Sequence, residues 1–165
     1  ARTSPHNPTE DSHSVMSIQL ADMLDGLDFF NDFTYPELET IARHLTYLAA
    51  KKGDVIFHEG EPGSYMLILI DGRISIAKGG EHGQHLLSYE SKGRLVGEMA
   101  LLDRERRSAT CTADTDCELL TLSHEGLERL AAGQPALAYR LMFTIARLLS
   151  RRLRRTSGVL SEYLN

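Results

Sequence analysis

The sequence contains little cysteine and no long apolar segment, and both absences narrow the class of protein. No apolar run in the 165 residues approaches the roughly 20 residues that a membrane-spanning helix needs, so we expect no membrane partner. Residues 1–14 are polar and lack the apolar core of a signal peptide. The two cysteines, Cys111 and Cys117, flank the sequence TADTD, where we expect a turn. A disulfide between them is one interpretation, and the one that we favour is two buried thiols in a cytoplasmic protein.

The composition is ordinary for a globular protein. Hydrophobic residues make up 42% and charged residues 25% of the chain. A length of 165 residues allows one domain with a hydrophobic core. We therefore predict a flexible tail over residues 1–15 and a single domain over residues 16–165.

The charge is unevenly distributed. A formal net charge of −5 argues against a general nucleic-acid binder, and we predict that this chain binds no nucleic acid. From Arg140 to Arg155, however, there are six arginines and no acidic residue. One interpretation is a solvated helix face, and the other is contact with an acidic partner or with an added domain.

Two short helices are predicted before the middle of the chain. Residues 16–31 mix apolar and acidic side chains and indicate a helix that ends near Gly26. Thr34 and Glu37 stand three positions apart, which is the spacing of a capping box. Apolar residues then continue at helical spacing as far as Leu45.

After Lys51 the pattern changes to short apolar segments separated by glycines. The sequence IDGRI favours a tight turn between two strands, because Asp-Gly accommodates the backbone of a hairpin turn. About eight such strands without alternating helices indicate a mainly β fold with flanking helices, an antiparallel β-roll or jelly roll. The clearest strand segments cover residues 54–58, 64–70, 73–78, 84–90, 108–113 and 117–122.

Two helices are predicted at the C-terminal end. Ser123 can cap a helix that ends at Gly133, and a longer helix follows over residues 136–156. Such a helix carries an apolar stripe that is either core-facing or a coiled-coil seam, and we favour a seam between two copies. The stripe consists of Ile145, Leu149, Leu153, Thr156 and Leu160.

The segment GEMALLDRERRSAT, residues 97–110, has the chemistry of an anion site. A helical turn beginning after Gly97 would leave backbone N–H groups available to an anion, and Ala100 leaves room beside them. Arg107 offers a planar set of donors for phosphate oxygens, whereas Glu98 accepts hydrogen bonds from hydroxyls. A ribose phosphate would satisfy both, and the alternative is that Glu98 and Arg107 pair with each other.

The same segment resembles the phosphate-binding cassette of the cyclic-nucleotide-binding domain family. Residues 52–76 resemble the first hairpins of that family, and residues 85–98 and 146–165 are similar to segments of its bacterial cAMP receptor subgroup. The resemblance covers about residues 20–165. It implies a β-roll fold and a cyclic nucleotide as ligand, with cAMP expected and cGMP possible, and no other cofactor.

The resemblance also implies roles for individual cassette residues. Gly97 and Glu98 match the pair that contacts the ribose 2′-hydroxyl. Met99 and Ala100 match backbone donors to the cyclic phosphate, and Arg107 matches the arginine that pairs with it.

Three further matches and two departures complete the comparison with the family. Ser108 matches the group beside the phosphate, and Thr156 and Ser157 match residues that contact the adenine amino group, the second from a partner subunit. This implies a homodimer through the helix over residues 136–156. The departures are Arg106, where many relatives have proline, and Arg94, where an acidic residue is usual.

Three functions compete at this point. The leading hypothesis is a non-catalytic cyclic-nucleotide sensor that signals through its C-terminal helices. The second is the ligand-binding part of a cAMP-receptor-type transcription regulator, whose DNA-reading helix-turn-helix we expect to be absent from these residues. The third is an enzyme that uses Glu98 as a base or holds a metal, but His82 and His85 have no evident third ligand, so we predict neither catalysis nor a metal site. We expect His58 and His124 to be surface or capping residues.

Overall fold

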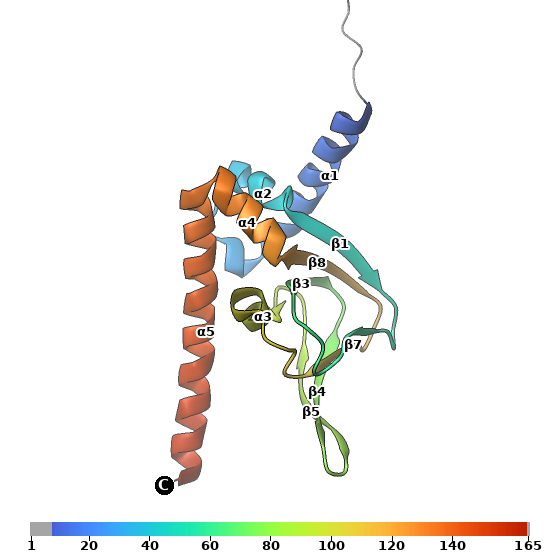
Figure 1. Ribbon diagram of the computed structural model, residues 1–165, viewed down its shortest axis with the longest axis vertical. Coiled ribbons are helices and arrows are strands. Elements are labelled where there is room, and N and C mark those ends of the chain that lie inside the picture. The colour runs from blue at the N-terminus through green and yellow to red at the C-terminus, as the bar shows by residue number, and fades with distance from the viewer. Residues whose placement is uncertain (1–7, 165) are drawn as a thin grey trace, which may run out of the picture. The chain divides into compact units, whose positions relative to one another are not determined.

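The computed structural model describes the backbone of residues 8–164 and the side chains of residues 16–158. The chain forms two units, Ala1–Leu127 and Glu128–Asn165. In chain order the elements are α1 (Pro8–Leu24), the 3₁₀ helix η1 (Asp28–Phe30), α2 (Tyr35–Ala42), β1 (Leu45–Ala50), β2 (Val55–Phe57), β3 (Tyr65–Asp71), β4 (Ile74–Gly80), β5 (Gly83–Glu90), β6 (Leu95–Val96), α3 (Glu98–Asp103), β7 (Thr110–Ala113), β8 (Cys117–Ser123), α4 (His124–Gly133) and α5 (Pro135–Leu164) (Figure 1).

The first unit is built on two four-stranded antiparallel sheets. Their strand orders are β1-β8-β3-β6 and β2-β7-β4-β5. Strand β1 pairs with β8 along its whole length, with Leu45 opposite Leu122 and Ala50 opposite Cys117. This arrangement confirms the predicted antiparallel β-roll with flanking helices.

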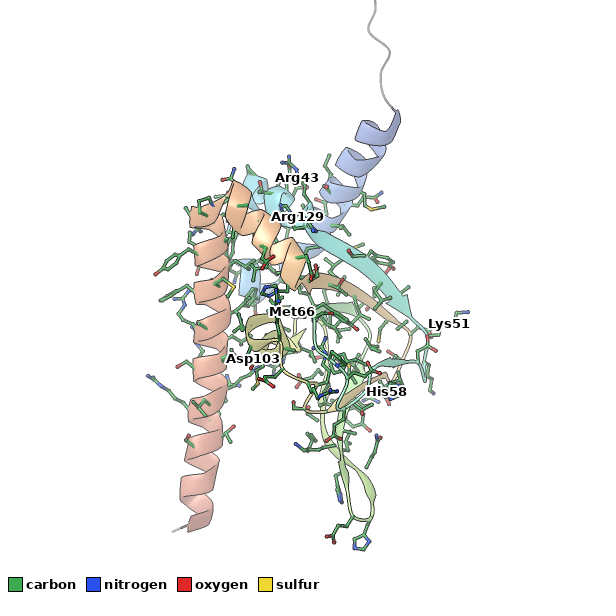
Figure 2. All side chains as sticks on the ribbon, viewed as in Figure 1. Arg43, Lys51, His58, Met66, Asp103 and Arg129 are labelled. Atoms are coloured by element: carbon green, nitrogen blue, oxygen red, sulfur yellow. The ribbon has the colours of Figure 1, made fainter. Side chains whose placement is uncertain are left out.

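Strand β3 lies at the centre of the core. Leu67 and Leu69 belong to the apolar cluster that both sheets share, together with Ile74 and Leu119. Met66, on the opposite face of β3, is also fully buried (Figure 2). A strand that is buried on both faces reads as a continuous apolar run, and this accounts for the sequence YMLILI.

The N-terminal helices partly match the prediction. The capping box is confirmed, because the Glu37 N–H donates to Thr34 Oγ1 at 3.4 Å and the Thr34 N–H donates to Glu37 Oε1 at 2.9 Å. Helix α1 begins at Pro8, inside the segment predicted as a tail, where proline suits the first helical turn. The remainder of that predicted tail, residues 1–7, lies outside the described residues. The helical spacing that extended to Leu45 was misleading, because α2 ends at Ala42 and Leu45 opens strand β1.

The second unit contains most of α4 and the whole of α5. Helix α5 extends past both ends of the range predicted for it. Its predicted apolar stripe is not uniform, because Ile145 is fully buried whereas Leu153 is 67% exposed. The side chain of Leu160 lies outside the described residues.

Both cysteines are free and buried, which confirms the interpretation as reduced thiols. Cys111 lies on β7 in the shared core cluster, and Cys117 opens β8 in the same cluster. Burial and the neighbouring Cys117 thiol raise the pKa of Cys111 to about 12, so this thiol stays protonated and unreactive at neutral pH.

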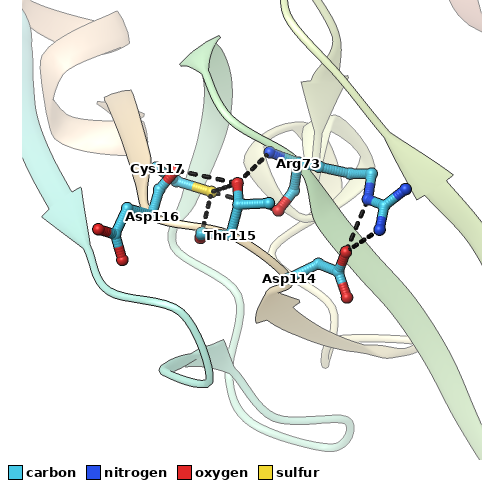
Figure 3. Close-up of polar contacts among 5 residues, drawn as sticks. All are labelled: Arg73, Asp114, Thr115, Asp116 and Cys117. Carbon is cyan, nitrogen blue, oxygen red and sulfur yellow. Dashed lines mark hydrogen bonds and ion pairs between the residues drawn. The ribbon is translucent and has the colours of Figure 1, made fainter.

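The turn after β3 and the turn before β8 are joined by hydrogen bonds. The Arg73 N–H donates to Thr115 Oγ1 at 2.9 Å (Figure 3). The Arg73 carbonyl accepts from the Asp114 N–H at 2.9 Å. The Arg73 Nε donates to Asp114 Oδ2 at 2.6 Å, and the Cys117 thiol donates to the Arg73 carbonyl at 3.3 Å (Figure 3). Gly72 makes this approach possible, because a Cβ there would overlap the carbonyl oxygen of the opposite turn.

We expect Gly72→Ala to destabilise the protein more than Gly53→Ala. Both glycines have left-handed backbones, with φ of +95° and +91°, so alanine costs about 1–3 kcal/mol of conformational strain at either position. Only at Gly72 would the added Cβ meet neighbouring atoms, namely the Asp116 carbonyl and the Cys117 sulfur. Chemical denaturation of the two variants measures the difference, and equal losses of stability would contradict the close packing of the turns.

Candidate functional site

The candidate site begins where β6 ends. Gly97 has a φ of +78°, a left-handed conformation that glycine adopts without strain, and it caps the six-residue helix α3. A Cβ at Gly97 would collide with Nη1 of Arg107. Glycine is therefore required here both by the backbone turn and by the close approach of the arginine.

Arg107 is a buried cation, with 4% of its surface exposed. Its Nη2 donates to the Tyr65 carbonyl at 2.6 Å, and its Nη1 donates to the Gly97 carbonyl at 3.4 Å. Its guanidinium carbon lies 4.1 Å from the ring centre of Phe57 and 4.7 Å from that of Tyr65. Burial lowers the pKa of Arg107, but a guanidinium remains charged at neutral pH. Two aromatic faces thus hold a positive charge beside the start of α3.

The main chain of Arg107 is fixed as firmly as its side chain. Its N–H donates to the Glu61 carbonyl and its carbonyl accepts from the Gly60 N–H, both at 2.8 Å. Arg106 forms an isolated β-bridge with Pro62, and its Nη1 donates to the Gly60 carbonyl at 2.7 Å. Arg106, which departs from the family pattern, therefore ties the cassette to the loop between β2 and β3.

The first turn of α3 packs closely against that same loop. A Cβ at Gly63 would overlap the Cβ of Ala100, so small residues are needed on both sides of the contact. Glu98 is 5% exposed, whereas Met99 is 59% exposed. The structure places Gly97 directly beside the guanidinium of Arg107, and it buries Glu98 and Ala100 in the first turn of α3. Direct pairing of Glu98 with Arg107 was the alternative interpretation. The hydrogen bonds found for the guanidinium go to main-chain carbonyls.

The other predicted site residues lie farther along the chain. Ser108 is exposed in the bend between Arg107 and β7. Thr156 and Ser157 are exposed on α5, in the second unit, and Thr156 Oγ1 donates to the Arg152 carbonyl at 3.1 Å.

Phe57 and Tyr65 were predicted as strand residues, and their role in the site was missed. Each lies at an end of the loop that separates β2 from β3. Phe57 reaches Arg107 because β2 pairs with β7, whereas Tyr65 opens β3, which pairs with β6 just before Gly97. The only available signal was an aromatic residue on either side of a glycine-rich loop, which by itself is a weak one.

Other candidate sites receive no support from the side chains over residues 16–158. No group of three or more His, Cys, Asp or Glu residues is arranged to hold a metal among them. His82 and His85 are exposed in and beside the turn between β4 and β5. None of the helices described here is long and apolar enough to cross a membrane.

Comparison with known proteins agrees with the site. The family model described as "Cyclic nucleotide-binding domain" matches residues 48–134, which include the whole cassette. The chain is 32% identical over 130 residues to the "Cyclic AMP receptor protein" of Thermus thermophilus, covering 78% of this chain and 58% of that one. It is 35% identical over 107 residues to the "cAMP-dependent protein kinase regulatory subunit" of Hypocrea atroviridis, covering 65% and 22%.

A solved structure supports the same relationship. A cyclic nucleotide-binding domain from Methylobacillus flagellatus superposes with a TM-score of 0.76 at 25% identity, covering 88% of this chain and 82% of that one. The chain spans about half the length of the cAMP receptor relatives that it matches, 55% of one and 58% of another.

We expect the Phe57 ring and the Arg107 charge to be energetically coupled. In a double-mutant cycle of Phe57→Leu and Arg107→Met, measured by chemical denaturation, the coupling should be about 0.5–2 kcal/mol, because leucine keeps the apolar contact but loses the aromatic face. Phe30→Leu is the matched control, since Phe30 is a buried aromatic residue that contacts Phe29 and Phe33. Additivity in the Phe57 cycle would show that the ring is only packing.

Proposed function

Because this chain belongs to the cyclic nucleotide-binding domain family, we propose that it is a non-catalytic sensor of cAMP that signals through its C-terminal helices. The observation that carries this proposal is the buried guanidinium of Arg107. A buried cation is costly unless an opposite charge or a set of hydrogen bonds compensates it. Two neutral carbonyls, two ring faces and the charge of Glu61 supply part of that compensation. A cyclic phosphate would supply the negative charge and accept from the remaining donors of the guanidinium.

The neighbouring groups fit the rest of the sugar phosphate. The Glu98 carboxylate would accept from the ribose 2′-hydroxyl beside Gly97. The backbone N–H groups of Met99 and Ala100, at the start of α3, would donate to the phosphate oxygens. Ser108 would contribute beside Arg107. These assignments rest on the family resemblance and on the geometry of the cassette.

The base would be read by α5 in a homodimer. Six residues of α5 recur at alternating spacings of three and four, which is the pattern of a coiled-coil seam. The first and fifth are strongly exposed, at 68% and 67%. They are Tyr139, Met142, Ala146, Leu149, Leu153 and Thr156.

In such a seam, Thr156 would lie beside its twin and Ser157 would point toward the partner's nucleotide. A hydroxyl oxygen accepts from the adenine amino group, whereas guanine offers a carbonyl at that position. We therefore propose that cAMP is preferred over cGMP.

A second candidate function is the ligand-binding part of a cAMP-receptor-type transcription regulator. The similarity to the Thermus thermophilus protein favours it. Several of the relatives that match are named as transcriptional regulators or as a protein kinase regulatory subunit, which favours either candidate over an enzyme.

We expect Arg107→Ala to weaken cAMP binding by about 2–5 kcal/mol in a calorimetric titration, because it removes one member of a charge-assisted pair. Glu98→Ala should weaken binding of cAMP more than binding of its 2′-deoxy analogue, which lacks the hydroxyl. Arg106→Ala is the matched control, because it removes a neighbouring arginine whose side chain bonds to the protein's own loop. If Arg107→Ala binds cAMP as tightly as the parent protein, the anion site lies elsewhere.

We expect light scattering at micromolar concentration to show a dimer, and Leu149→Asp or Leu153→Asp to give a monomer. Arg151→Asp is the control, because Arg151 is exposed and lies outside the seam positions. The double variant Thr156→Ala, Ser157→Ala should narrow the preference for cAMP over cGMP, which we expect to be about 1–3 kcal/mol in the parent protein. A monomeric parent protein, or unchanged selectivity in the double variant, would mean that α5 does not read the base.

A further inference from the structure

His124 connects three parts of the first unit. It is the first residue of α4, and its backbone N–H donates to the Ser64 carbonyl, just before β3, at 2.9 Å. Its ring Nδ1 lies 3.1 Å from the carbonyl oxygen of Leu101 in α3. A carbonyl only accepts hydrogen bonds, so this contact requires the proton on Nδ1. The side chain therefore donates directly from the start of α4 to the helix of the cassette.

The start of α4 is held closely in other respects too. Ser123 Oγ accepts from the Gly126 N–H at 3.0 Å, which caps the helix. A Cβ at Gly126 would lie 2.9 Å from the His44 carbonyl oxygen, so the first turn of α4 rests directly on the backbone before β1. The first turn of α4 therefore cannot shift freely when the side chain of His124 is changed.

The position of α4 in the chain gives this contact its importance. The first unit ends at Leu127 and the second begins at Glu128, so α4 starts in one unit and ends in the other. His124 thus lies at the last helix start before the second unit. Rigid secondary elements are one of the means by which proteins carry coupling, and α4 is such an element.

We propose that His124 is a positioning residue that couples α3 to α4. This inference rests on the proposed function, in which the nucleotide phosphate is held at Met99 and Ala100. Leu101 follows these residues directly in a helix of six residues. When the first turn of α3 moves toward a phosphate, the Leu101 carbonyl moves with it, and the His124 hydrogen bond transfers the displacement to the start of α4.

Three variants separate coupling from simple support of the helix. His124→Leu removes the donor but keeps a side chain of similar bulk. His124→Asn restores an N–H donor near the position of Nδ1. Ser123→Ala weakens the start of α4 by removing its cap but leaves the bond to Leu101, so it is the matched control.

The first experiment measures cAMP affinity by calorimetry and hydrogen exchange of the α4 peptide by mass spectrometry. In the parent protein, cAMP should change the exchange rate of α4 by roughly tenfold, which is an ordinary size for a coupling between sites. In His124→Leu the affinity should stay within about threefold, while the change in α4 falls below about twofold. His124→Asn and Ser123→Ala should both retain the change. A full response in His124→Leu, or an equal loss in Ser123→Ala, would overturn the proposal.

A second measurement needs no ligand and separates the two proposals. Gly97→Ala strains the start of α3, because alanine disfavours the φ of +78° and its Cβ would collide with Nη1 of Arg107. In the ligand-free protein this variant should alter the exchange of α4 if His124 is present, and should leave it unaltered in a His124→Leu background. If the parent protein does not bind cAMP or cGMP, the proposed function fails and this comparison alone decides the role of His124. An identical effect of Gly97→Ala in both backgrounds would refute the coupling.

Discussion

The cassette depends on keeping one positive charge buried. The guanidinium of Arg107 lies between the rings of Phe57 and Tyr65 and donates to two main-chain carbonyls. Burying a charge is expensive, so the surrounding groups have to be placed accurately to offset the cost. The left-handed turn at Gly97 belongs to the same arrangement, since it leaves room for the guanidinium. The roll is the scaffold that fixes the position of this charge.

Much of the fold could be predicted from the sequence, because the signals were local. Turn chemistry at Asp71-Gly72, the capping box at Thr34 and the glycine-punctuated strands each depend on neighbouring residues, and the structure has all three. The Asp71-Gly72 turn is not a hairpin turn, however, because β3 before it and β4 after it belong to different sheets. Strand β1 was missed because its first residue, Leu45, continued the helical spacing of the preceding segment. Only its pairing with β8, far away in the sequence, makes this segment a strand.

The candidate site was predictable to a similar degree. One short segment contains Gly97, Glu98, Ala100 and Arg107. Their residue types and spacing were enough to predict a site for an anion and a hydroxyl group. The contact of Phe57 and Tyr65 with Arg107 could not be predicted. It depends on how the strands pair, and no spacing of residues in the sequence indicates it. Arg106 departs from the family pattern, and its structural role could not be predicted from the sequence. In the structure it donates a hydrogen bond to the loop that the cassette packs against.

The pairing of β1 with β8 has a consequence for the order in which the protein folds. The first strand of the roll finds its partner only in the last one, with Leu45 opposite Leu122. The chain between β1 and β8 forms a long loop, and closing a long loop costs conformational entropy before the contacts that offset it have formed. The pairing of β1 with β8 should therefore form late in folding. During synthesis, the first sheet cannot be completed until β8 has left the ribosome, and β1 must wait as an unpaired edge. The α4 segment follows directly after β8, so the second unit becomes available only as the roll closes.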